Sequence, residues 1–333
     1  MSPSCDCQMM PVPWMLVAVR AVHYCACLLL FGLAAFDCLV AAPAARRNGG
    51  RAPSASSVSL RLSRRGGWGG PALLMVALAS GVAWLVLVAG EMAEMPPLQA
   101  WHEGAVRVVW EQTRIGRAWQ LRSACLAAAC AAAAVLALER PASRWRSAAA
   151  WLLFVSTAGL TAGLAWAGHG LAGEGRIGTC HSIADVLHLL VSGLWPAALL
   201  PFAMTLRRLR KSPLPDAGSI AAAVVRRFSA MSLISVTALS VTGFVNSWVL
   251  VGSVGALFHT RYGQTLAVKL GIFVVMIGFG AVNLLVLKPR IARGERKSGP
   301  LRWLQFNVTS ELFLGTLIVL IVALLGMLAP MTE

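Results

Sequence analysis

Three side chains that can bind a metal ion recur near the middle of the chain at the spacing of one helical face. His181, Asp185 and His188 are four and three residues apart, so on an α-helix they share a face, with about 6 Å along the axis between the first two. A neutral imidazole suits copper or zinc, and the carboxylate could bind the metal directly or fix the tautomer of one imidazole. We predict a metal site here; the alternative is a polar face lining the interior of a helix bundle.

His181, Asp185 and His188 are called the metal-capable row below. The glycine-rich stretch before this row supplies further candidate ligands. In the sequence AGHGLAGEGRIGTCH, His169 precedes His181 by a dozen residues and Cys180 lies directly beside it. Because the stretch is flexible, we expect His169 to fold back against His181. Cys180 offers a soft thiolate for Cu(I), and an ordinary exposed thiol is an equal alternative.

Two other histidines are candidates at a distance from the row. His102 follows Trp101 in a polar connection, where it could assist metal capture or simply anchor the segment at the membrane surface. His23 lies within the first apolar run, one turn after Arg20, and we expect it to line a route between helices.

The composition is that of a polytopic membrane protein. Of the 333 residues, 58% are hydrophobic and 13% are charged, whereas soluble domains average about 25% charged residues. A span needs roughly 20 mostly apolar residues. The sequence predicts eight spans and an all-α membrane helical bundle, because the runs are continuously apolar rather than alternating. The expected spans cover residues 12–42, 71–92, 121–138, 148–168, 181–206, 228–252, 263–287 and 304–329.

The basic residues predict the orientation of the bundle. Most of the 29 Lys and Arg residues fall in the first, third, fifth and seventh connections, and positive charge marks cytoplasmic loops. We therefore expect both termini, and the metal-capable row, on the outer face. The net charge of +16 then reflects the basic residues of the cytoplasmic connections and does not indicate nucleic-acid binding. The second connection, around residues 98–119, is predicted to be an amphipathic segment on the outer membrane surface.

An ordered series of motifs resembles the bacterial CopD/PcoD copper-resistance membrane proteins. The series comprises AGHG, HSIADVLHLLVSGLW, RRFSAMSLISVTALSVTGFVNSW and VGSVGALFHTRYGQTLAVKL. The matching positions are Gly168, His169, His181, Asp185, His188, Trp195, Arg227, Phe228, Ser229, Thr242, Gly243, Asn246, Thr260, Tyr262, Gly263, Leu266 and Lys269. The chain departs from the family pattern at Gly170 and at Pro196, where a kink is expected.

The resemblance implies a bacterial inner-membrane protein of eight spans that handles a copper ion, Cu(I) or Cu(II), taken from the periplasm. It also implies a soluble periplasmic copper carrier of the CopC type as partner, and import as the usual direction. The motifs divide the chain into residues 1–90 with two spans and a basic loop, a copper-handling core at 91–290, and a last span at 291–333. No P-loop is present, so we expect passive or ion-coupled transport and no enzyme activity.

Two other functions stay open on the sequence alone. A b-type membrane cytochrome would pair histidines across spans at matching depth, and His23 with His188 is the pair the sequence offers. A copper-binding receptor would hold the metal and pass it to a partner without moving it across the membrane.

Overall fold

The fold is a bundle of long helices. The computed structural model describes residues 14–46, 69–138, 143–167, 175–212, 216–292 and 299–328, and these residues form helices and connections without a strand. The helices of the first half are α1 (Trp14–Ala35), η1 (Phe36–Ala41), α2 (Ala42–Arg46), α4 (Gly69–Met92), α5 (Pro97–His102), α6 (Ala105–Gln112), α7 (Arg114–Ala137), α8 (Ser143–Ala162) and η2 (Gly163–Ala167). Those of the second half are α9 (Gly175–Ser192), η4 (Gly193–Ala197), α10 (Leu199–Arg210), α11 (Ala217–Val251), α12 (Val254–His259), α13 (Arg261–Val282), η5 (Asn283–Leu287), α14 (Lys288–Ala292) and α15 (Gly299–Leu325).

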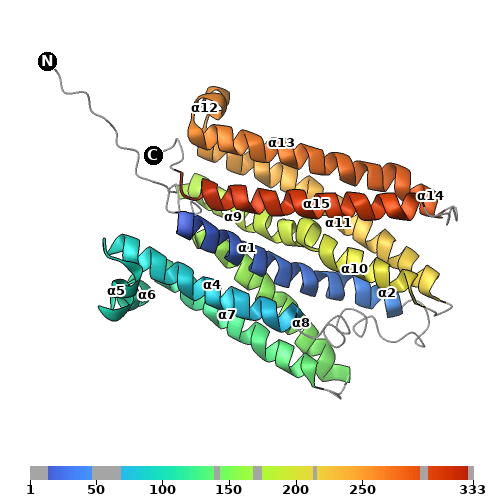
Figure 1. Cartoon of the computed structure of the whole chain (residues 1–333), viewed down its shortest axis with the longest axis horizontal. Coiled ribbons are helices and arrows are strands. Elements are labelled where there is room, and N and C mark those ends of the chain that lie inside the picture. Colours follow the sequence, from blue (N-terminus) through green and yellow to red (C-terminus); the bar gives the residue numbers. More distant parts are fainter. Residues whose placement is uncertain are drawn as a thin grey trace.

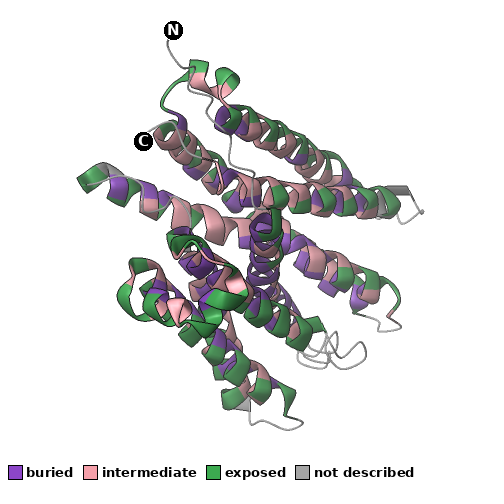
Figure 2. Ribbon diagram, turned by 60° about the vertical axis from the view of Figure 1, so that its left-hand side comes forward, coloured by how far each residue is buried: buried purple, intermediate pink, exposed green. Residues whose placement is uncertain are grey.

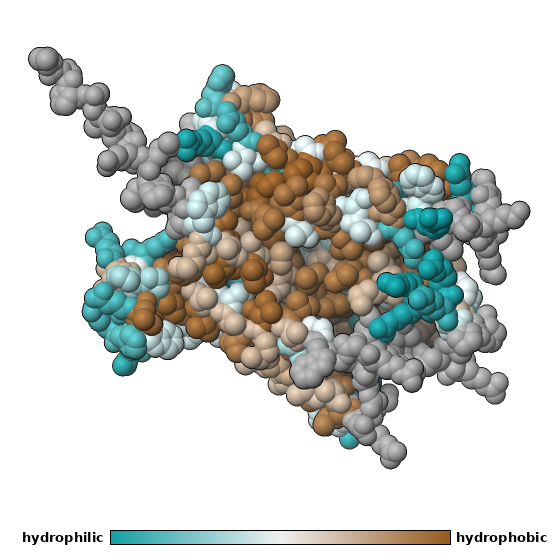
Figure 3. Space-filling model, viewed as in Figure 1, coloured by the Kyte–Doolittle hydropathy of each residue, from teal (hydrophilic) through white to brown (hydrophobic). Residues whose placement is uncertain are grey.

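Eight helical stretches are long and apolar enough to cross a membrane, which confirms the predicted all-α polytopic bundle. They run roughly side by side (Figure 1). Apolar side chains cover the middle of the face shown in Figure 3, and polar side chains gather at its two ends. This distribution suits a bilayer, because hydrocarbon can satisfy no exposed polar group between the ends.

Two predicted boundaries are wrong. The sequence predicts a sixth span from residue 228, yet α11 begins at Ala217, so Arg226 lies within the helix and not in a connection. It predicts a third span from residue 121, yet α7 begins at Arg114. The Thr113 side chain caps this helix by accepting a hydrogen bond from Gly116 N. In both places the helix continues past the membrane-like apolar window, because charged residues do not end a helix that is capped and packed.

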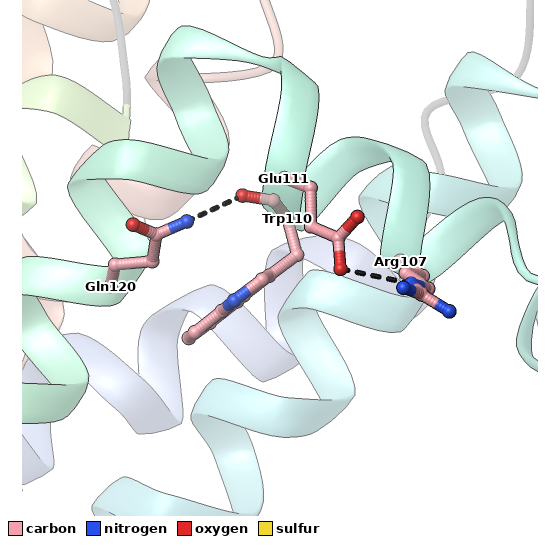
Figure 4. A network of polar contacts seen from close by, with 4 residues as sticks. All are labelled: Arg107, Trp110, Glu111 and Gln120. Carbon is pink, nitrogen blue, oxygen red and sulfur yellow. Dashed lines mark hydrogen bonds and ion pairs between the residues drawn. The ribbon is translucent and has the colours of Figure 1, made fainter.

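The connection before α7 is helical and partly amphipathic, in agreement with the prediction. In α6 only Val109 is buried, and the exposed Arg107 pairs with Glu111 at 2.9 Å. Gln120 of α7 donates to the Trp110 carbonyl at 2.8 Å. Figure 4 shows both contacts: the ion pair lies within α6, and the Gln120 hydrogen bond fastens the end of α6 to α7.

The first helix is the centre of the bundle. The span Trp14–Ala45 is 61% buried, more than any other candidate span, because α1 packs against α4 and α8 on one side and against η4 and α15 on the other. Figure 2 shows buried residues concentrated where the helices cross. The two largest hydrophobic clusters among the described residues lie around Trp84 and around Phe202, and two smaller ones lie around Tyr262 and Ala323.

Three helical stretches are π-helical: η1, η4 and η5. Pro196 lies inside η4, where its missing N–H would break a regular α-helix. The expected irregularity at Pro196 is therefore a π-helical turn, a feature common at functional sites.

The crossing of α1 and η4 depends on a glycine. A Cβ at Gly32 would lie 2.8 Å from the Ala197 carbonyl carbon and 2.9 Å from the Ala198 nitrogen. Backbone atoms cannot move aside cheaply, so only hydrogen fits at this point.

Gly32→Ala should therefore lower the free energy of unfolding by about 1–3 kcal/mol through overpacking. Gly271→Ala is the matched control: Gly271 lies in the membrane helix α13, where an added Cβ would meet nothing within 4 Å, so this variant should gain up to about 1 kcal/mol. Thermal unfolding of the purified protein in detergent measures both. Equal stability of the two variants would contradict the close crossing.

Candidate metal site

The metal-capable row lies on one face of α9 and points toward α11 and α13. α9 begins at the end of the bundle opposite to α14 and packs along α11 (Figure 1). His188 contacts α11 through Thr242, and Asp185 contacts it through Asn246. The predicted face therefore turns into the bundle.

A hydroxyl orients the ring of His188. The Thr242 oxygen lies 2.7 Å from the Ala238 carbonyl oxygen and 2.9 Å from His188 Nδ1. When the hydroxyl donates to the carbonyl, the ring donates from Nδ1, and Nε2 keeps the lone pair that a metal can use. A Cβ at Gly243 would lie 3.4 Å from His188 Cε1, so the ring packs closely over this glycine.

Asp185 is held by groups from two helices. Asn246 Nδ2 donates to Asp185 Oδ1 at 3.3 Å, and Tyr262 and Lys269 of α13 interact with the carboxylate electrostatically. Lys269 also acts on His188. The lysine compensates the charge of Asp185 within the span, as intramembrane carboxylates require.

Two polar atoms beside Asp185 lack partners. His181 is 1% exposed, and its Nδ1 has no hydrogen-bond partner among the described residues; the same holds for Asn246 Oδ1. Buried polar atoms are rarely left unsatisfied. These two atoms are therefore the best candidates on this face for an additional proton or cation.

The row does not form a single chelate. Among the described residues no three His, Cys, Asp or Glu side chains gather closely enough to hold a metal ion. Seven residues of α-helix rise about 10.5 Å, so His181 and His188 occupy different depths. His169 lies outside the described residues, and its predicted approach to His181 stays a prediction.

The remaining predicted ligands lie apart from the row's described contacts. Cys180 is exposed on α9, and His102 is exposed at the end of α5. His23 is buried in α1 and belongs to a second polar centre formed with α4 and α7.

In this second centre a hydroxyl again fixes a histidine. The Ser80 hydroxyl donates to Val76 O at 2.5 Å and accepts from His23 Nδ1 at 2.9 Å. Here, however, His23 Nε2 accepts a hydrogen bond from Arg122 Nη2, with Cys27 Sγ 3.4 Å away. No lone pair of His23 is left for a metal.

Arg122 is the residue that the sequence did not reveal. The hydropathy pattern places it at the membrane end of a connection, yet it is 1% exposed and stacks over Trp119 with its guanidinium carbon 4.2 Å from the ring centroid. Arg20 lies 5.1 Å from the Trp84 ring and donates to Gly326 O at 2.9 Å. An arginine close to an otherwise apolar run is the signal that could have suggested this centre.

Fold and site together define a class: a multi-pass α-helical membrane protein with metal-capable side chains buried between its helices. Residues 9–179 match the family model described as copper resistance protein D-like, N-terminal domain, and residues 222–325 match that of copper resistance protein D. The chain belongs to the copper resistance protein D family, and it is a copper-related protein of the inner membrane. The match reaches well into the region before residue 90, where the motifs alone were weak.

Named relatives agree with this assignment. The chain is 30% identical to copper resistance protein D of Pseudomonas syringae pv. tomato over 325 residues, which cover 95% of this chain and 97% of the relative. It is 25% identical to inner membrane protein YebZ of Escherichia coli (strain K12), over 94% of this chain and 98% of the relative. It is 30% identical to copper transport protein CutJ of Bacillus subtilis (strain 168), over 62% of this chain and 36% of the relative. No solved structure matches.

Thr242→Val should weaken copper binding by about 10–100-fold, because it removes the acceptor that orients the His188 ring. Thr237→Val is the matched control: this threonine lies on the same helix, is exposed, and bonds only its own helix at Leu233 O. Competition titration of the purified protein with a chromogenic copper chelator measures both affinities. Equal affinities would remove His188 from the site.

Proposed function

We propose that the chain carries copper across the inner membrane, from the periplasm toward the cytoplasm, without enzymatic chemistry. The basic residues on α10 and α14 lie at one end of the bundle, and the positive-inside rule assigns that end to the cytoplasm. The row on α9 then faces the periplasm, and a CopC-type carrier is the proposed source of the ion.

One observation carries the proposal: Thr242 holds His188 through Nδ1, which leaves Nε2 as the ring nitrogen that can bind a metal. The unpartnered His181 Nδ1 one turn before Asp185 supports a first position nearer the periplasm. We infer that copper passes from one weak binding position to the next, each with few protein ligands, and that no single tight site holds it. This series of positions is called the relay below. Movement across a membrane favours this arrangement, because an ion must bind well enough to enter and weakly enough to leave.

Lys269 has a part in this relay. Its ammonium group interacts electrostatically with Asp185, so each group offsets part of the other's charge when no metal is bound. An arriving copper ion competes with the lysine for the carboxylate, which keeps the ion from being trapped.

The haem alternative finds less support. Axial ligation by His23 and His188 needs a free lone pair on each ring, and that of His23 accepts from Arg122. A Soret absorption band in the purified protein would nevertheless favour the cytochrome.

The receptor alternative uses the same metal-capable row and differs from transport only in that no copper crosses the membrane.

Copper flux into sealed vesicles reconstituted with the purified protein tests the proposal. His188→Ala should reduce the initial rate at least about tenfold through loss of a ligand, and it keeps the span apolar enough to insert. His259→Ala is the control, since this histidine is exposed on α12 and should leave the rate unchanged. If the wild-type protein binds copper without flux, the receptor function is correct. If His188→Ala leaves the flux unchanged, the proposed relay through His188 is wrong.

A further inference from the structure

A carboxyl group lies buried in the second half of the bundle, away from the metal-capable row. Glu311 of α15 is 1% exposed. Its Oε1 accepts from Asn283 Nδ2 at 2.6 Å, and Asn307 Nδ2 donates in turn to Asn283 Oδ1 at 2.8 Å. Trp195 also hydrogen-bonds to the carboxyl group.

None of these partners is charged. No ion pair involving Glu311 occurs in the part of the chain that the structure describes. Of the charged residues on elements that pack against α15, Lys288 of α14 lines the same cavity. Arg210 of α10 bonds Gln305, and Arg20 of α1 bonds Gly326 near the other end of the helix.

The other titratable groups on the packed helices lie elsewhere. On α13, Tyr262 and Lys269 act on Asp185. On α1, His23 and Cys27 belong to the Arg122 centre, and Tyr24 accepts from Arg20. Isolated negative charge in such surroundings is costly, so the carboxyl group needs a proton or a passing cation.

Glu311 has access to a cavity. A cavity of about 210 Å³ has mostly apolar walls, and its polar lining residues are Glu311, Asn283, Lys288, Ser229 and Ser232. Ser232 Oγ has no partner among the described residues. A water held by these polar groups can carry a proton to and from the carboxyl group.

The donors to Glu311 come from the irregular parts of two helices. Trp195 is in the π-helical η4, and Asn283 is the first residue of the π-helical η5. Trp195 follows His188 by seven residues, across the change from α9 to the π-helical η4. A displacement of α9 at the metal-capable row would reach Glu311 through this side chain.

We propose that Glu311 is a proton-exchange site that makes copper transport depend on pH. The inference rests on the proposed transport function and adds a second ion to it. In the resting form the carboxyl group holds a proton; it releases that proton to a cavity water as copper passes, and the carboxylate then compensates the copper charge. One O–H bond breaks at the carboxyl group and one forms on the water, with no oxidation or reduction.

Infrared difference spectra of the purified full-length protein test the inference without copper. At pH values above about 6, where exposed carboxyl groups stay ionised, a change of pH should alter a carboxylic acid C=O stretching band in the wild type, and Glu311→Gln should remove that band. Glu111→Gln is the matched control, since Glu111 is half-exposed on α6 and should leave the band in place. A titrating band that persists in Glu311→Gln, or a wild type without one, overturns the inference.

Asn283→Leu provides a second variant if Glu311→Gln does not fold. It keeps the carboxyl group and removes one hydrogen bond to it, so the band should remain and shift in frequency. An unshifted band contradicts the assignment to Glu311.

Vesicle flux separates this inference from the transport proposal. Wild-type flux should rise with pH as Glu311 loses its proton, and Glu311→Gln should be at least about tenfold slower and independent of pH, because the amide mimics the protonated form. No wild-type flux refutes transport whatever the spectra show. Flux with the same pH dependence in wild type and Glu311→Gln refutes only the proton site.

Discussion

The need to satisfy every polar group inside a hydrocarbon layer determines how this protein presents its histidines. A serine or threonine hydroxyl within a transmembrane helix gives its hydrogen to a carbonyl four residues earlier, and its oxygen can then only accept. Ser80 and Thr242 are both placed to do this, and each contacts the Nδ1 atom of a histidine, which favours a proton on that nitrogen. The two centres differ at the other nitrogen: Arg122 occupies that of His23, whereas that of His188 stays available.

The same constraint separates charge between the two parts of the bundle. The buried charges around α1 and α7 are the guanidinium groups of Arg20 and Arg122, stacked on indole rings. The helices α9 and α15 carry the carboxyl groups of Asp185 and Glu311. A positive ion is repelled by the two guanidinium groups. Beside α9 and α15 the carboxyl groups face a lysine or hold a proton at rest, so they can attract a cation only when Lys269 gives up Asp185 or Glu311 loses its proton.

Hydropathy and spacing predicted the eight spans and the common face of His181, Asp185 and His188, because both depend on local periodicity. Partners distant in sequence could not be predicted. Thr242 lies 54 residues from His188, and Arg122 lies 99 residues from His23, so their contacts follow from how the helices cross. The dozen residues between His169 and His181 fall partly outside the described chain, and their arrangement stays a prediction.

Arg20 has a consequence for how the protein is made. It lies in the first span, and its acceptor is the carbonyl of Gly326, 306 residues later, at the end of the last one. During synthesis the ribosome delivers the first helix to the membrane long before that carbonyl exists. Until α15 inserts, this guanidinium lacks its carbonyl acceptor and has only Tyr24 and the Trp84 ring as partners among the residues that the structure describes.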